Sequence, residues 1–307
     1  PADGSPILNI EQDIVLGAYY LTYNRPGVFD QKPKAFMSVG EGIMARDNGY
    51  ITVQTPVRIN FRGEIRITTL GRLIFNEIFP EDFPYQNLEM TKKRLQKVLA
   101  QVYAQYGQEE TAKIADELKR VGFDFATRSG ISMGMDDFRD IEGVDKIMGD
   151  GEKKAKSISD QYDQGLITNE ERYRLTVDNW MKTDSTVQST LAEQFVKEDS
   201  SMSIAVNSGA RGNIGQVKTA VGLLGVVTDA TGRAIELPIK NNYKYGLTPL
   251  EYFTATRGAR KGMIDTALKT ADSGYLTRRL VDVSQDVFTT NEEIADTAAI
   301  IEADATA

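Results

Sequence analysis

The sequence predicts an α+β fold that is mostly helical. Near the N-terminus apolar residues alternate with polar ones, as in a strand that buries one face. Over residues 144–191 two apolar stripes recur at helical spacing, and after Pro249 no further proline interrupts a long helical stretch. We therefore expect a small β unit, an antiparallel helical coiled-coil hairpin and a long C-terminal helix.

The first 84 residues predict the β unit. Residues 7–23 carry a mostly apolar run, typical of a buried helix or strand. From Val57 to Ile67 the apolar side chains recur at every second position, with Gly63 at the expected turn. This pattern predicts a β unit with one solvated face, and Pro80 and Pro84 mark a boundary after it.

Helical spacing begins after Leu88. A first helix is expected from its apolar positions, which are Leu95, Val98, Leu99, Val102 and Tyr106. A second helix is expected over about residues 111–121, ending at Gly122. Gly130, Gly134 and the pair Asp136-Asp137 then predict a loop.

Residues 144–191 predict the hairpin. Two apolar stripes flank Gly165 and a capping-box sequence from Thr168 to Glu171, whose side chains can satisfy the first free N–H groups of a new helix. Asp184 interrupts the second stripe, where one polar residue costs stability but can fix register. Two ordinary bundle helices are the alternative to a coiled coil. The stripes are Val144, Ile147, Met148, Gly151, Ala155, Ile158 and Tyr162, then Tyr173, Val177, Trp180, Val187 and Leu191.

The long helix is expected to begin at Thr248-Pro249-Leu250-Glu251, an N-cap, a first-turn proline and a capping-box glutamate, and to run to about Gln285. Its interior holds Gly258, Gly262 and Gly274, each of which costs about 1 kcal/mol relative to Ala. Bare backbone lets a bulky partner approach and eases bending, so a nucleic-acid end could lie against this helix. A packed central helix is the alternative.

The composition excludes several classes of chemistry. The chain has no cysteine, which excludes disulfides and thiolate metal sites, and no histidine, which excludes Ser-His-Asp triads and imidazole acid–base catalysis within it. No apolar run approaches the roughly 20 residues that span a bilayer, so no membrane is expected as a partner. The net charge is −8, yet residues 257–279 hold six basic side chains and two acidic ones.

The long helix also carries a recognisable sequence. Gly258-Ala-Arg-Lys-Gly262, followed by Asp265-Thr-Ala-Leu-Lys-Thr-Ala-Asp-Ser-Gly-Tyr-Leu-Thr-Arg-Arg-Leu-Val-Asp282, resembles the bridge helix of the largest (β′) subunits of bacterial-type DNA-directed RNA polymerases. The resemblance extends over nearly the whole chain. Its other parts are Pro1-Ala-Asp-Gly-Ser-Pro-Ile and Gln12-Asp-Ile-Val-Leu-Gly-Ala-Tyr-Tyr, Thr68-Thr-Leu-Gly-Arg72 and Ser208-Gly-Ala-Arg211-Gly212.

The resemblance implies six regions in an internal piece of a β′ subunit, which fits an opening without Met. They are a pore-type region with the β unit (1–84), a helical secondary-channel region (85–137), a rim coiled-coil hairpin (138–198), a nucleotide-contacting loop region (199–245), the bridge helix (246–288) and an acidic tail (289–307).

The resemblance also implies roles for matched residues. Arg211 would bind the incoming nucleoside triphosphate, because its planar donors match phosphate oxygens; a structural ion pair is the alternative. Thr270 and Ala271 would lie beneath the base pair being formed, and Gln12 and Arg72 would face the channel through which nucleotides enter. Six residues would support the helix or contact nucleic acid, namely Arg260, Lys261, Gly262, Lys269, Gly274 and Arg278. Structural salt bridges are the alternative for the charged ones.

The hairpin tip would receive protein factors that insert into that channel, although a merely solvated turn is the alternative. The tip residues concerned are Tyr162, Gly165, Leu166, Thr168 and Glu171. The other implied partners are the β, α, ω and σ subunits, the DNA template, RNA and nucleoside triphosphates. The implied location is the cytoplasm, at the bacterial nucleoid. A non-catalytic scaffold whose hairpin docks transcription factors is the competing hypothesis.

The implied chemistry is phosphoryl transfer with Mg²⁺ ions held by aspartates outside this chain. We expect no catalytic residue and no metal ligand within it, and no activity from the chain alone; Asp136-Asp137 is interpreted as structural. The sequence departs from the family at Arg257, where well-known relatives have His, and at Ala205, where many have Met. Ile294 stands about where a zinc-ligand Cys is expected, which puts a zinc site in doubt.

Overall fold

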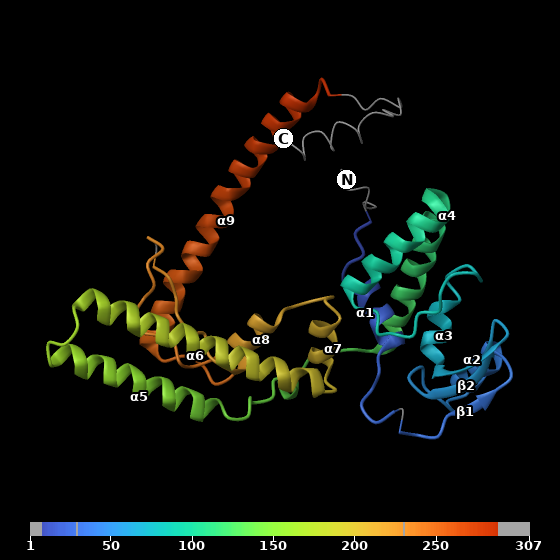
Figure 1. The fold of residues 1–307 in the computed structure, drawn as a ribbon, viewed down its shortest axis with the longest axis horizontal. Helices are drawn as coiled ribbons and strands as arrows, with labels where there is room; N and C mark the ends of the chain where they lie inside the picture. Colours follow the sequence, from blue (N-terminus) through green and yellow to red (C-terminus); the bar gives the residue numbers. More distant parts are fainter. Residues whose placement is uncertain (1–7, 29, 230, 288–307) are drawn as a thin grey trace, which may run out of the picture. The chain divides into compact units, whose positions relative to one another are not determined.

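The computed structural model describes residues 8–28, 30–229 and 231–287. The chain divides into two compact units, one formed by Pro1–Val227 with Ala234–Tyr252 and the other by Thr228–Arg233 with Phe253–Ala307. The described part is mostly helical with one small sheet (Figure 1), which confirms the predicted fold class. The six-region division stays a prediction, and its opening motif (1–7), Ile294 and the acidic tail lie outside the described residues.

A three-stranded sheet forms the β unit. β1 (Lys34–Phe36) pairs parallel with β2 (Pro56–Phe61), and β2 pairs antiparallel with β3 (Glu64–Thr69). Arg62 and Gly63 join β2 to β3 with φ angles of 54° and 85°, the two left-handed residues that a type I′ hairpin turn needs. The predicted turn is confirmed, but the alternation holds only for β2. Val57, Ile59 and Phe61 are buried, whereas Ile65 and Ile67 are 67% and 57% exposed. The register pairs Ile59 with Arg66, which places the two isoleucines of β3 on the opposite face. β1 was not predicted, because three residues are too few to show a period.

The Arg62 side chain ties this turn to the chain that follows β3. Two helices, α2 (Val39–Asp47) and α3 (Leu70–Asn76), complete the β unit. The last carbonyls of a helix lack partners within it, and the Arg62 guanidinium donates hydrogen bonds to carbonyls at and beyond the end of α3. The acceptors are the backbone oxygens of Asn76, Phe79, Pro80, Glu81 and Phe83.

Two helices, α1 (Gln12–Thr22) and α4 (Lys92–Ser129), form the neighbouring core. α4 is broken at Gly107, whose φ of 75° and ψ of −170° lie outside the helical region. Both arms of α4 bury apolar residues with α1 in one cluster, which includes Val15, Ala18, Leu95, Val98, Leu99, Val102, Ile114 and Leu118. Residues 12–22 are therefore a buried helix, and the first helix expected after Leu88 is confirmed.

The predicted end of the second helix at Gly122 is wrong. The second arm of α4 continues to Ser129 and ends at Gly130, which adopts a left-handed φ of 59°. Gly122 instead lies where α4 crosses α1: an added Cβ would stand 2.9 Å from the Cα of Ile14, and one added to Gly17 would collide with the Gly122 carbonyl. The glycine permits a close approach of two backbones rather than a stop.

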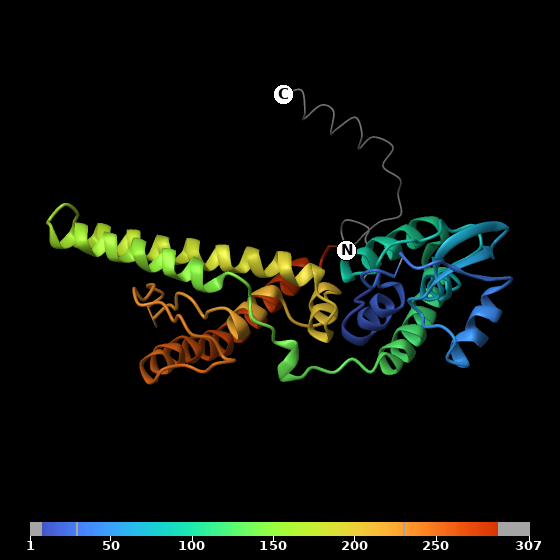
Figure 2. The same cartoon turned by 90° about the horizontal axis from the view of Figure 1, so that it is seen from below.

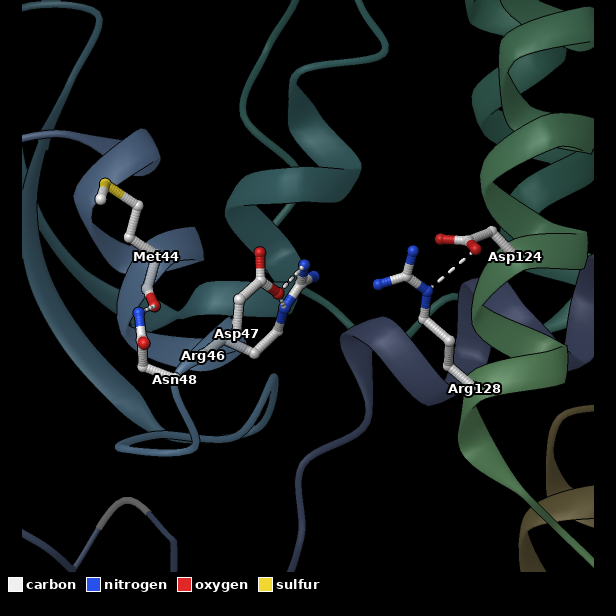
Figure 3. A network of polar contacts seen from close by, with 6 residues as sticks. All are labelled: Met44, Arg46, Asp47, Asn48, Asp124 and Arg128. Atoms are coloured by element: carbon white, nitrogen blue, oxygen red, sulfur yellow. Dashed lines mark hydrogen bonds and ion pairs between the residues drawn. The ribbon is translucent and has the colours of Figure 1, made fainter.

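α2 of the β unit meets α4 at Phe125. The guanidinium carbons of Arg46 and Arg128 each lie 5.7 Å from the centre of the Phe125 ring, a distance that suits cation–π attraction. Each arginine is also paired with an acid of its own helix, Arg46 with Asp47 and Arg128 with Asp124 (Figure 3). The contact of Arg46 with the buried Phe125 ring thus joins the β unit to the helical core.

The predicted helical hairpin is present. α5 (Val144–Asp163) and α6 (Asn169–Lys197) lie side by side and antiparallel (Figures 1 and 2). The backbone of Gly151 in α5 packs against Trp180 and Thr183 in α6. At its base the hairpin shares an apolar cluster with α7 (Ser201–Asn207) and α8 (Ile214–Val221). The knobs-into-holes packing of a true coiled coil stays a prediction.

Asp184, the polar residue in the second stripe, is paired. Its carboxylate accepts a hydrogen bond from the Lys218 ammonium in α8, and it lies against the backbone of Gly225. Lys218 is 7% exposed. Removing one partner of such a pair would leave the other charge poorly solvated, so the contact links α8 to α6 specifically.

The C-terminal helix is α9 (Pro249–Ser284), which is helical throughout and has no buried residue. Its predicted start is confirmed: the Thr248 hydroxyl accepts from the Glu251 N–H, and the Glu251 carboxylate accepts from the Thr248 N–H. None of the helices in residues 8–28, 30–229 and 231–287 is both long and apolar enough to cross a membrane.

Gly17→Ala should destabilise the protein by about 2 kcal/mol, because the added methyl group must push α1 away from the backbone of α4 and overpacking of this kind costs about 1–3 kcal/mol. Gly149→Ala is the matched control: it lies in α5, and nothing stands within 4 Å of an added Cβ. This control should gain up to about 1 kcal/mol through helix propensity. Urea unfolding followed by circular dichroism measures both, and unchanged stability of the Gly17→Ala protein would contradict the close crossing.

Candidate functional site

The loop of residues 208–213 presents Arg211 between α7 and α8. Gly209 and Gly212 both have a φ of 76°, a backbone conformation that glycine adopts without strain. The Arg211 N–H donates to the Ala205 carbonyl at 3.2 Å, and the buried Ser208 hydroxyl accepts from the Ala210 N–H. The Arg211 side chain is exposed and has no ion pair or hydrogen bond with any described residue. A fixed loop therefore holds a free guanidinium.

Lys92, the first residue of α4, connects this loop to the start of α1. Its N–H donates to the Ser208 carbonyl at 2.9 Å, and its ammonium pairs with Glu11 at 3.0 Å. Gln12, which follows Glu11 in the chain, is exposed and has a φ of 52°, a left-handed conformation that is rare outside glycine. Such outliers concentrate at functional sites. The structure thus links the predicted residues Gln12 and Arg211 through Lys92.

Arg72 does not face a channel, which corrects the expectation for this residue. It is 6% exposed, and burial lowers the pKa of its guanidinium. The Nε atom donates to the Thr22 carbonyl, and Nη1 donates to the carbonyl and side-chain oxygens of Asn87. Arg72 joins α3 to the end of α1 and supports the fold.

The residues predicted on α9 are all exposed or half-buried. At about 100° per residue they fall on two opposite faces of the helix. The arginine face, about 60° wide, holds Arg260, Ala271, Gly274 and Arg278. The lysine face, about 180° from Arg260, holds Gly262 and Lys269, while Lys261 and Thr270 lie between the two. The glycines and cations predicted on this helix therefore lie on two faces rather than on one.

The alternative of structural salt bridges finds no support within the described residues. Four cations are expected to support the helix or nucleic acid, and none of them forms an ion pair with a described residue. They are Arg260, Lys261, Lys269 and Arg278. The Thr270 hydroxyl is satisfied within the helix, since it donates to the Thr266 carbonyl at 2.8 Å. The charged groups are available to a partner that is not part of this chain.

The hairpin tip is a compact turn with two exposed apolar side chains. Gly165 has a φ of 74°, and the N–H groups of Gly165 and Leu166 donate to the carbonyls of Tyr162 and Gln161, which is the Schellman arrangement at the end of α5. Tyr162 is 40% and Leu166 69% exposed. Only half of the predicted capping box forms: the Thr168 hydroxyl accepts from the Glu171 N–H, and no reciprocal bond is found in the described residues.

The tip is also braced from outside the hairpin. Arg172, near the start of α6, pairs with Glu236 at 2.9 Å and lies over the Tyr162 ring at 5.3 Å. The neighbouring Tyr173 hydroxyl donates to the Ala234 carbonyl at 2.8 Å. Residues 234–236 therefore hold the start of α6, which the sequence did not predict because these partners lie more than 60 residues apart.

The first turn of α9 is anchored by one carboxylate. Beyond the capping box, Glu251 accepts hydrogen bonds from the N–H groups of Lys240 and Asn241 and from the Asn241 side chain. Burial raises the pKa of Glu251, but hydrogen bonds from Thr248 and Asn241 outweigh it and lower the pKa to about 2. The sequence predicted the bonds to Thr248 but could not predict those from Lys240 and Asn241.

Within residues 8–28, 30–229 and 231–287, no three acidic side chains converge to hold a metal ion. Asp136 and Asp137 belong to a short 3-10 turn (Met135–Asp137), in which Asp137 accepts a hydrogen bond from the Gly134 N–H. A groove of about 520 Å³ between α5 and α6 carries charges of both signs, including Asp150, Lys154 and Lys182. This donor set does not fit a divalent ion.

The Glu251 carboxyl should titrate near pH 2 rather than near its ordinary pKa of 4.5. Because the pKa is lowered in the folded state, its hydrogen bonds stabilise the start of α9 fully above pH 4.5 and are lost as the pH falls from 4.5 towards 2. Carbon-13 NMR of the labelled side-chain carboxyl measures this midpoint. A midpoint near 4.5 would show that the surrounding donors do not hold the carboxylate.

Comparison with known proteins identifies the family. The sequence model described as RNA polymerase Rpb1, domain 3 matches residues 1–138, and that of RNA polymerase Rpb1, domain 5 matches residues 246–302. The DNA-directed RNA polymerase subunit beta' of Desulforudis audaxviator is 45% identical over 288 residues, which cover 94% of this chain and 25% of that subunit.

Two further relatives agree. The subunit beta' of Moorella thermoacetica is 43% identical over 303 residues (98% of this chain, 26% of that subunit), and that of Bacillus pumilus is 37% identical over 333 residues (94% and 28%). The chain thus spans about a quarter of the length of these curated relatives. Matches that extend over nearly all of its sequence show that the chain belongs to the β′ (Rpb1) family of DNA-directed RNA polymerase subunits.

Proposed function

We propose that this chain is part of the catalytic core of a DNA-dependent RNA polymerase, where it contributes surfaces for the nucleoside triphosphate, the growing RNA and the template. The observation that carries the proposal is Arg211, an exposed cation without a partner among the described residues, on a loop whose backbone is bonded to α4 and α7. Family membership makes template-directed nucleotide transfer the activity to which such a residue would contribute.

Arg211 would act by position and charge. Phosphoryl transfer needs aligned reactants and neutralised phosphate oxygens more than covalent help from the protein. A guanidinium offers a fork of donors that matches two phosphate oxygens at once. Because the 208–213 loop is already fixed by its own hydrogen bonds, little backbone conformational entropy would be lost when the triphosphate binds. Gln12 would lie on the same approach, linked through Lys92.

α9 would offer its two faces to different neighbours. We assign the arginine face to nucleic acid, because Ala271 and Gly274 leave room for a base pair between the two cations Arg260 and Arg278. The lysine face, with Gly262 and Lys269, would then contact protein. Thr270 lies beside the arginine face and would border the same base pair.

The hairpin tip would bind protein factors through Tyr162 and Leu166. Exposed apolar side chains surrounded by polar ones are typical of binding surfaces. Gly165, Thr168 and Glu171 shape the turn that presents them. The other partners proposed are the β, α, ω and σ subunits, the DNA template and RNA, in the bacterial nucleoid. A scaffold without a role in catalysis is not favoured, because the relatives are named as polymerase subunits.

Mg²⁺ is the ion that this chemistry would use, to neutralise charge on the reacting phosphates. The described residues of this chain do not fit it, since no acidic cluster is found among them. We propose, on the resemblance to the family, that the Mg²⁺ ligands and the catalytic step lie outside this chain. What these residues would contribute is binding and orientation.

Arg211→Ala in the complete polymerase should lower kcat/KM for nucleotide addition by about 10-fold to 100-fold, because a hydrogen-bonded charge contact contributes about 1.5–3 kcal/mol. Arg211→Lys keeps the charge but loses the fork, so an intermediate effect is expected. Arg120→Ala, which removes an exposed arginine paired with Glu117 on α4, is the matched control. Single-nucleotide extension kinetics measure all three, and an Arg211→Ala enzyme with unchanged kinetics would remove the proposed role.

Deleting residues 163–169 should weaken the binding of channel-inserting factors and leave factor-free elongation unchanged. The finer variant, Leu166→Ser, should reduce factor affinity about 10-fold or more, since burial of a leucine side chain contributes about 1.5–3 kcal/mol. Leu88→Ser removes a leucine of similar exposure (57% against 69%) at a distant position and is the control. Titration with a labelled factor measures the affinity of each enzyme. If the deletion and Leu166→Ser enzymes bind the factor as tightly as the unmodified enzyme, the docking proposal is wrong.

A further inference from the structure

We propose that Glu251 is a positioning residue for nucleotide addition, because it fixes the first turn of α9 to the base of the α5–α6 hairpin. The inference rests on the proposed function and deepens it. It concerns an acidic residue that touches neither substrate nor nucleic acid in the roles proposed above. Its effect would reach the reaction only through the placement of α9.

Five hydrogen bonds converge on this one carboxylate. Oε1 accepts from the Lys240 N–H at 3.0 Å and from the Asn241 N–H at 3.3 Å. Oε2 accepts from the Asn241 side chain at 2.8 Å and from the N–H and hydroxyl of Thr248 at 3.0 and 2.8 Å. An ordinary capping-box glutamate bonds only its own N-cap residue. Glu251 therefore also joins the helix to a second segment.

That second segment, residues 239–246, is itself fixed to the hairpin base; we call it the anchor segment. It caps α8, because the N–H groups of Tyr243 and Lys244 and the Asn242 side chain donate to the last carbonyls of that helix. These acceptors are the backbone oxygens of Thr219, Ala220 and Val221. Since α8 packs in the apolar cluster of α6, these hydrogen bonds tie the anchor segment to the base of the hairpin.

Two further carboxylates hold the anchor segment to α5. The Lys240 ammonium pairs with Glu152 in α5 at 2.6 Å. Asp140, just before α5, accepts from the Lys244 ammonium at 2.9 Å and from the Tyr245 hydroxyl at 2.7 Å. The connection from α5 to α9 therefore consists of Glu152, Asp140, the anchor segment and Glu251. Glu251 is the last link in it.

A small error at the start of a long helix becomes large further along. Thr270 lies 19 residues beyond Glu251, or about 28 Å along a helix that rises 1.5 Å per residue. A tilt of about 10° in the first turn would then displace Thr270 by about 5 Å. Misplacement by about 1 Å is enough to cost about 100-fold in rate.

The chemistry of the carboxylate makes the proposal testable with an isosteric change. Glu251→Gln keeps the shape but replaces one acceptor oxygen by an NH₂ donor. That donor would face either the Lys240 and Asn241 N–H groups or the Asn241 side chain and Thr248. The backbone N–H groups on both sides can only donate, so either orientation loses at least one hydrogen bond, although the Asn241 amide could turn to present its oxygen. The low pKa of Glu251 agrees with a site built for a charged acceptor.

The experiment uses complete polymerase assembled with the full-length β′ subunit. Glu251→Gln and Glu251→Ala should lower kcat for single-nucleotide addition about tenfold with KM changed less than about twofold, because placement of α9 is lost while triphosphate contacts remain. Glu41→Gln is the matched control: Glu41 also bonds its own helix start, accepting from the Met37 N–H at 2.7 Å, but it joins no second segment. It should leave kcat unchanged.

A double-mutant cycle separates positioning from general damage. Asn241→Asp alone sets two carboxylates against each other and should lower kcat. Combined with Glu251→Gln, it restores a donor–acceptor pair between the two side chains, and kcat should recover about threefold or more over either single variant. Recovery of this kind supports a direct link between residues 241 and 251.

The outcomes separate this inference from the proposed function. If the unmodified polymerase fails to extend RNA, the proposed function fails. If it extends RNA and the Glu251 variants behave like Glu41→Gln, the positioning role is wrong and the proposed function stands. A raised KM with unchanged kcat in the Glu251 variants would overturn the role as well. So would a lowered kcat in both single variants that does not recover in the double variant. Should Glu251→Ala fail to assemble, the isosteric variant and the cycle still decide.

Discussion

α1 and α4 cross with backbone against backbone, at Gly17 and Gly122, and the geometry of the candidate nucleotide site depends on this contact. A methyl group on either glycine would hold the helices apart. The crossing packs α1 against the second arm of α4, and the first arm buries its apolar residues in the same cluster. At the start of that first arm, Lys92 bonds both Glu11 and Ser208, so the ammonium and the N–H of a single lysine tie the Arg211 loop to the start of α1.

Charge is used differently in the two parts of the site. At the base of the hairpin, the carboxylates of Asp140, Glu152 and Glu251 each accept from donors in residues 240–248, so they serve as structural links. On the Arg211 loop and on α9, the cations have no ion-pair partner among the described residues. A net acidic chain can therefore still present locally cationic surfaces, because the local distribution of charge matters more than its sum.

The sequence predicts the elements whose pattern is local. The β-hairpin around Gly63, the hairpin helices and the start of α9 each follow from a period or a capping sequence within a few residues. Gly122 was misread as a helix end because glycine has two uses, and only the position of α1 distinguishes them. Arg72 was misplaced for a similar reason: its role is set by Thr22 and Asn87, which no spacing rule could bring together.

α9 combines a fixed start with a compliant interior. Three interior glycines cost it about 3 kcal/mol of helix propensity relative to alanine, and none of its residues is buried within this chain. Its helical form therefore depends on the anchored first turn and on partners beyond this chain. Five hydrogen bonds hold Glu251 in the first turn, whereas the three glycines lie further along the helix, where they lower the cost of local bending. The sequence of α9 therefore places its backbone constraint at the start and its compliance in the interior.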